Sequence, residues 1–143
     1  MKNATNLTGL EFIQSIISGK IPNPPISQTV PMKMVKAEEG CVEFEVQADE
    51  RHLNPMGGVH GGFAATVLDS VTGCAVHTTL PANTNYATVD LNIKMVKPVP
   101  MDTPLIAIGK VISKSKLIST CEGYLKDSDG KIYAHGTATC VIK

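Results

Sequence analysis

The chain has no excess of charge, because thirteen acidic residues balance thirteen basic ones among its 143 residues. It therefore lacks the basic surplus that is typical of nucleic-acid-binding domains. No apolar run approaches the length of about eighteen residues that a membrane-spanning helix needs, and the N-terminus lacks the apolar core of a secretory signal. We therefore expect neither a nucleic-acid nor a membrane partner.

Paired cysteines and metal-ligand spacings are also missing. The four cysteines form no C-x-x-C motif: they are Cys41, Cys74, Cys121 and Cys140. No pair of the four histidines has metal-ligand spacing, so we expect neither a metal nor a redox cofactor. Cysteines within apolar patterns are typical small core residues, and the pattern indicates reduced thiols in a cytoplasmic protein. The sequence also lacks the G-x-S-x-G, P-loop and dinucleotide motifs.

The length, with 43% hydrophobic and 18% charged residues, predicts one globular domain over residues 1–143. Residues 1–27 form an N-terminal helix and a proline-rich linker that leads into the domain. The helix is expected over 8–18, capped by Thr8 with Glu11 three residues later. Three prolines within 22–25 then prevent the helix from restarting.

Alternation of apolar and polar residues predicts strands in most of the remaining chain. Their expected ranges are 28–36, 41–47, 85–97, 105–112, 117–125 and 132–142. In the strand over 85–97, Ala87, Val89, Leu91, Ile93 and Met95 are expected to share the buried face. The order of elements predicts an α+β fold with an antiparallel sheet packed on one long helix.

That helix dominates the sequence. From Gly61 to Thr88 the only formally charged side chain is Asp69, and its neighbours are mostly apolar. The composition predicts a helix that is buried around its whole girth. A carboxylate in such surroundings is costly to ionise. Two interpretations are open: Asp69 bonds to hydroxyls such as Thr66 or Ser70, or it is a catalytic carboxylate whose basicity is raised by its dry setting.

Four glycines lie within residues 57–62, immediately before the predicted helix. If the helix begins near Gly61, its first N–H groups have no partner in the helix and can bind a developing oxyanion. A tight turn is the simpler interpretation of these glycines. Eight residues separate Gly61 from Asp69, which corresponds to about 12 Å along one helix. The spacing therefore predicts a two-fold dimer in which Gly61 of one chain faces Asp69 of the other.

The motif Asn54-x-x-Gly57-x-x-His60-Gly61-Gly62, followed by Asp69, resembles the hotdog-fold acyl-CoA thioesterases, in particular the PaaI-like (phenylacetate-pathway) group. The resemblance extends from about residue 8 to the end of the chain. It implies a sheet wrapped around the central helix, a homodimer with composite sites that pairs into a dimer of dimers, and hydrolysis of an aromatic or medium-chain acyl-CoA to the free acid and coenzyme A.

The resemblance also implies roles for single residues. Asp69 is expected to activate water or to attack the thioester carbonyl, and Gly61 to offer its backbone N–H to the thioester oxygen. Asn54 orients the water or the thioester, and His60 contacts the substrate near the thioester. Both have simpler interpretations: His60 as a helix-entry residue and Asn54 as a turn residue.

Four further residues are candidates for substrate binding. Gly62 follows the oxyanion donor, and Thr88 lies on the next strand, where related enzymes place a hydroxyl. Gly73 has no side chain where some relatives carry a Ser or Thr, and this leaves room for an acyl group. Lys114 belongs to a lysine-rich turn that suits the phosphates of coenzyme A, although solvated hairpin lysines are an equally good interpretation.

Two alternative functions use the same fold. A hotdog hydratase or dehydratase usually places its catalytic histidine before a proline-rich turn, whereas His60 precedes two glycines. A non-catalytic acyl-CoA-binding sensor normally carries an attached regulatory segment, and it would leave Asp69 without a role.

Overall fold

The computed structural model describes residues 6–143. Its helices are α1 (Gly9–Ile17), the one-turn α2 (Ile26–Thr29) and α3 (Gly61–His77), and a short 3-10 turn spans Glu50–His52. The strands are β1 (Met32–Glu38), β2 (Cys41–Val46), β3 (Tyr86–Met95), β4 (Leu105–Lys114), β5 (Ile118–Lys126) and β6 (Ile132–Ile142).

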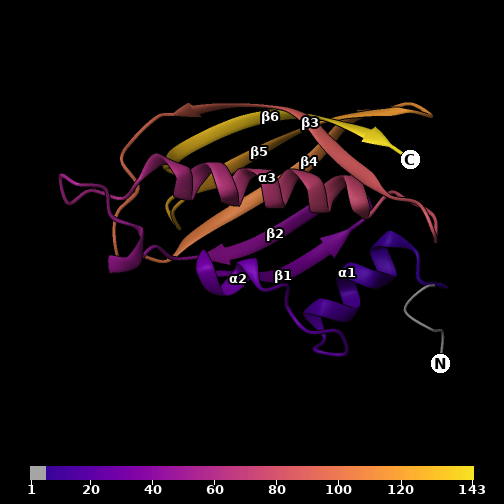
Figure 1. The fold of residues 1–143 in the computed structure, drawn as a ribbon, viewed down its shortest axis with the longest axis horizontal. Helices are drawn as coiled ribbons and strands as arrows, with labels where there is room; N and C mark the ends of the chain where they lie inside the picture. The colour runs from indigo at the N-terminus through magenta and orange to yellow at the C-terminus, as the bar shows by residue number, and fades with distance from the viewer. Residues whose placement is uncertain (1–5) are drawn as a thin grey trace.

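The six strands form one antiparallel sheet in the order β1-β2-β4-β5-β6-β3. The long helix α3 lies along one face of this sheet, while α1 lies beside the edge strand β1 (Figure 1). The expected α+β arrangement of an antiparallel sheet around one long helix is therefore confirmed. No helix within residues 6–143 is long and apolar enough to cross a membrane.

The N-terminal helix begins where its cap predicts. The hydroxyl of Thr8 accepts a hydrogen bond from the backbone N–H of Glu11 at 3.2 Å, and α1 buries Ile13 and Ile16. The expectation that the prolines prevent a new helix is wrong, because α2 begins directly after Pro25. Proline is favourable at a helix start, where its fixed φ suits the first turn and no N–H is needed. The following strand consequently begins at Met32 and not at residue 28.

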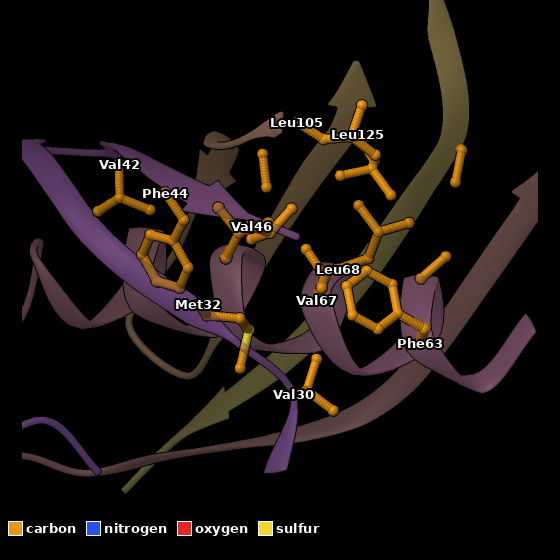
Figure 2. Close-up of a cluster of buried hydrophobic side chains, with 14 of the residues drawn as sticks. Val30, Met32, Val42, Phe44, Val46, Phe63, Val67, Leu68, Leu105 and Leu125 are labelled. Carbon is orange, nitrogen blue, oxygen red and sulfur yellow. The ribbon is translucent and has the colours of Figure 1, made fainter. Parts of the chain in front are cut away.

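The core lies between α3 and the sheet. Figure 2 shows Phe44 and Val46 of β2 gathered with Val67 and Leu68 of α3. Leu68 is fully buried, and Phe44 is 1% exposed. Apolar residues alternate along β2 with the partly exposed Glu43 and the exposed Glu45, as the period of two predicts.

A row of three glycines lets the helix approach the sheet closely. Gly109 of β4 pairs with Gly123 of β5, which pairs with Gly136 of β6. A Cβ added to Gly109 would lie 2.1 Å from the carbonyl oxygen of Val71, and one added to Gly123 would touch side chains of α3 at 3.1 to 3.3 Å. Side chains in this row would force the helix away from the sheet.

The opposite side of α3 is only partly covered by its own chain, so the expectation of a helix buried around its whole girth is wrong for the single chain. Val71, Thr72 and Val76 are fully buried, whereas Asp69 is exposed and Cys74 is half-buried. A single sheet covers only one side of a helix, and α1 contacts the C-terminal end of α3, where Gly9 meets His77.

The expected buried face of β3 is also partly wrong. A bulge between Thr88 and Asp90 inserts one extra residue, so Thr88 pairs with the inward-facing Cys140 and Val89 is 61% exposed. A bulge changes which side chains face the core. Thr88 thus faces α3, whereas the next residue, Val89, does not. The strand β3 is also an edge strand of the sheet.

Candidate active site

His60 caps the N-terminus of α3. Its Nδ1 accepts a hydrogen bond from the N–H of Gly62 at 2.8 Å, which satisfies one of the free donors of the first turn. A neutral imidazole that accepts at Nδ1 carries its proton at Nε2. The helix-entry interpretation of His60 therefore holds, and the N–H of Gly62 is engaged by this cap.

The N–H of Gly61 is the free donor of this turn. Within residues 6–143, no atom accepts a hydrogen bond from it. A Cβ on Gly61 would lie 2.7 Å from the sulfur of Met95, so the missing side chain leaves space for that methionine. This N–H lies where the sequence predicted an oxyanion donor, and its role as a donor to the thioester oxygen stays a prediction.

Asn54 organises the glycine-rich loop before the helix. Its side-chain oxygen accepts hydrogen bonds from the N–H groups of Met56 at 2.9 Å and Gly58 at 3.1 Å. The loop also needs a glycine at position 57, where φ is +86°. The turn interpretation of Asn54 holds for its oxygen, and the residue also lines the adjoining cavity.

The first cavity beside α3, which we call the N-terminal cavity, has a volume of about 490 Å³. Asn54, His60 and Gly61 line it, as do Lys97 and Tyr133. Lys97 is one of the lysines that the sequence offers for a basic rim around the phosphates of coenzyme A, whereas no sequence pattern marked Tyr133. The signal for Tyr133 was weak, because it lies on β6, which pairs with β3 only across a long separation in sequence.

The second cavity, the carboxylate cavity, has a volume of about 570 Å³ and lies against the exposed side of α3. Asp69, Ser70 and Cys74 form its α3 wall. The carboxylate of Asp69 accepts no hydrogen bond from any residue in the part of the chain that the structure describes, and the hydroxyl of Thr66 donates to the carbonyl of Gly62 instead.

Thr88 lines the same cavity as Asp69, as its position on the strand after the helix suggested. Its hydroxyl lies 3.7 Å from the sulfur of Cys140. Burial, assisted by the charge of Asp69, raises the pKa of Cys74 to about 12. The Cys74 thiol is therefore protonated near neutral pH.

Two other predicted residues lie differently from their expected roles. The space above Gly73 is filled by Tyr86, whose hydroxyl would lie 2.8 Å from an added Cβ, so it does not hold an acyl group. The ammonium of Lys114 donates to the carbonyl of Thr79 at 2.8 Å, beyond the C-terminus of α3, and it lines neither cavity.

The two cavities have no lining residue in common. Gly61 lines one and Asp69 lines the other, eight residues away on the same helix. Thus one chain does not bring the free N–H and the carboxylate to one carbonyl group. Within residues 6–143, no three His, Cys, Asp or Glu side chains gather in an arrangement that could hold a metal ion.

The profile of the thioesterase superfamily matches residues 56–134, which include the N-terminus of α3 and Asp69. Human acyl-coenzyme A thioesterase 13 is 28% identical over 107 residues, which are 74% of this chain and 76% of the human protein. These similarities confirm the resemblance that the glycine-rich motif suggested.

Two solved structures have the same fold. A phenylacetic acid degradation-related protein from Ralstonia eutropha JMP134 superposes with a TM-score of 0.81 at 27% identity, covering 90% of this chain and 98% of that one. A thioesterase protein from Streptococcus pneumoniae TIGR4, solved with coenzyme A, has a TM-score of 0.72 at 20% identity, with 78% and 88% covered.

Proposed function

Because the chain belongs to the thioesterase superfamily and is a thioester hydrolase, we propose that it hydrolyses an aromatic or medium-chain acyl-CoA to the free acid and coenzyme A. One observation carries the proposal: within residues 6–143, the carboxylate of Asp69 has no hydrogen-bond donor and the first N–H of the same helix has no acceptor, and the carboxylate borders a largely apolar cavity. The names of the human relative and of the coenzyme A-bound Streptococcus protein support the choice of acyl-CoA.

The proposed site is composite. Gly61 of one chain and Asp69 of a second copy meet across an antiparallel pair of α3 helices, which gives two equivalent sites under two-fold symmetry. The separate cavities in one chain support this arrangement, as does the exposed side of α3. The second copy would also provide the dry setting that the exposed Asp69 lacks in a single chain.

The edge strand β3 offers the remaining contact surface. Val89 is 61% exposed and Met95 is 58% exposed on this edge, beside the uncovered side of α3. An exposed apolar edge readily pairs with another strand. Pairing of β3 with β3 of a second copy would place the two α3 helices side by side. The resemblance further implies a dimer of dimers, and sedimentation analysis distinguishes the two assemblies.

In the proposed reaction, the N–H of Gly61 stabilises the negative charge that develops on the thioester oxygen. Asp69 either accepts a proton from the attacking water or attacks the carbonyl itself, and water then hydrolyses the resulting anhydride. The C–S bond breaks, a C–O bond forms, and the sulfur of coenzyme A takes up a proton. Water is the only co-reactant, so the proposal includes no metal or redox cofactor.

His60 and Asn54 line the N-terminal cavity, and we propose that the nitrogens that their caps leave unused, the imidazole Nε2 and the side-chain amide, hold the thioester or the water there. Lys97 lines the same cavity and suits a phosphate of coenzyme A better than Lys114, whose ammonium is engaged by Thr79.

Thiol release from a panel of aromatic and straight-chain acyl-CoAs tests the proposal, with the wild type beside Asp69→Ala. We expect the variant to lose about 10²-fold or more in kcat/KM while it keeps its fold and assembly. Asp129→Ala is the matched control, since Asp129 lies in the exposed turn between β5 and β6. If the wild type binds acyl-CoA but releases no thiol, the protein is a sensor and the proposal is wrong.

A further inference from the structure

We infer that Tyr86, together with Cys74, limits the size of the acyl group that the carboxylate cavity accepts. The inference rests on the proposed function, because it names the feature of the same site that selects the substrate. Both residues line the cavity that Asp69 borders, and Tyr86 is its largest side chain on the β3 side.

Tyr86 blocks the cavity close to the reacting group. Its hydroxyl lies against Gly73, which follows Asp69 by one helical turn, or about 6 Å along the helix axis. A Cβ at position 73 would lie 2.8 Å from this hydroxyl, so the tyrosine fits there only because the residue is glycine. The space that the missing side chain of Gly73 leaves is therefore occupied by Tyr86 and not by an acyl group.

The ring of Tyr86 is held in place by packing against other rings. Its centroid lies 5.6 Å from that of His77, which lies 5.4 Å from that of Phe12 on α1. The helix α1 is fixed against the end of α3, because the N–H of Gly9 donates to the carbonyl of Leu80 at 2.9 Å and a Cβ on Gly9 would overlap the carbonyl of His77. A wall supported by packed rings and a second helix cannot swing aside easily.

The rest of the cavity is lined mainly by apolar side chains, with Ser27 and Thr88 among its polar members. Met32 and Phe44, which Figure 2 shows pointing from the sheet toward α3, form the inner side, and Pro24 and Ile26 form the rim. An acyl group attached at Asp69 therefore meets apolar surface laterally and Tyr86 at the end. This shape favours a compact acyl group, aromatic or short, over a long straight chain.

The chain-length profile of kcat/KM tests the inference, measured with straight-chain acyl-CoAs from butanoyl to tetradecanoyl. In Tyr86→Ala the ratio of kcat/KM for dodecanoyl-CoA to that for hexanoyl-CoA should rise about 10-fold or more. Tyr86→Phe keeps the ring and should retain the wild-type profile. Tyr124→Ala is the matched control, because Tyr124 lies on the outer face of the sheet and packs on His135 instead.

A second variant acts in the opposite direction and decides the matter if Tyr86→Ala does not fold. Cys74→Leu adds bulk to the same cavity, so its profile should shift toward shorter acyl groups. A uniform fall in kcat/KM across all lengths in both variants would overturn the inference. If the wild type hydrolyses no acyl-CoA, the proposed function is wrong. Calorimetry then measures the affinity of each variant for the same panel of acyl-CoAs. An affinity profile that is unchanged in both Tyr86→Ala and Cys74→Leu would overturn the inference.

Discussion

The two sides of α3 differ in what touches them. On the packed side, the carbonyl of Val71 lies so close to β4 that Gly109 has no room for a side chain. On the open side, Asp69 is exposed and borders a cavity, and the first N–H of the helix has no acceptor among the described residues 6–143. The difference teaches that one helix can separate stability from chemistry, because the residues that hold it on the sheet are not those that we propose to face the substrate.

The largest expected effect on the open side comes from removing the free N–H. Gly61→Pro deletes this donor, and proline is well tolerated at the first position of a helix. His60 already has the extended conformation, φ −62° and ψ 137°, that precedes a proline. We expect kcat to fall about 10²- to 10³-fold, as for the loss of an oxyanion donor, with little change in the free energy of unfolding.

Gly61→Ala is the matched control, because it keeps the N–H and displaces the same sulfur of Met95. The measurement is kcat for thiol release, with urea unfolding of both variants alongside. Equal losses of kcat in the two variants would mean that the side-chain space, and not the donor, matters at this position.

On the packed side we expect the opposite result. In Gly109→Ala the new Cβ would lie 2.1 Å from the carbonyl oxygen of Val71, so the helix must shift on the sheet. Overpacking of this kind costs about 3 kcal/mol in the free energy of unfolding. Gly58→Ala is the control, since its Cβ would meet the side chain of Asn54 at an ordinary 3.6 Å. Urea unfolding of both measures the cost, and equal stabilities would contradict the tight contact.

This contrast also explains which parts could be predicted from the sequence. The strands, the start of α3 at Gly61 and the cap at Thr8 follow from local patterns: alternation, glycine placement and capping. The glycine row under α3 could not be predicted, because Gly109 and Gly136 enter one row only by pairing with Gly123 on the strand between them.

The incorrect predictions have physical causes of the same kind. The bulge at Val89 changes the inward face of β3, and no local pattern marked it. Asp69 was predicted on α3, but its exposure depends on where the sheet ends, which the apolar composition of the helix does not reveal. The role of Gly73 was misread because Tyr86, thirteen positions later, fills its space.

A mixing experiment tests whether the open sides of two copies form one site. Asp69→Asn and Gly61→Pro should each be nearly inactive alone. Mixed and reassembled in equal amounts, they should recover about a quarter of wild-type activity, because half of the dimers are mixed and each has one intact site of two. Asp69→Asn mixed with the double variant Gly61→Pro/Asp69→Asn is the control. No recovery in the first mixture, despite exchange of subunits, would contradict the composite site.

The smallest expected effect lies at His77, where the packed and open sides of α3 meet. Burial lowers the pKa of His77, so the unfolded chain takes up a proton more readily than the folded one. The free energy of unfolding should therefore fall as the pH drops through about 6.5, the ordinary histidine pKa.

His77→Phe keeps an aromatic ring between Phe12 and Tyr86 but cannot be protonated. Urea unfolding at pH 7.5 and pH 5.5 measures the loss of stability on acidification in wild type and variant. We expect a smaller loss in the variant, because its buried ring has no charged form to favour unfolding. An equal loss in both proteins would place the pH dependence in other groups and leave His77 as a packing residue alone.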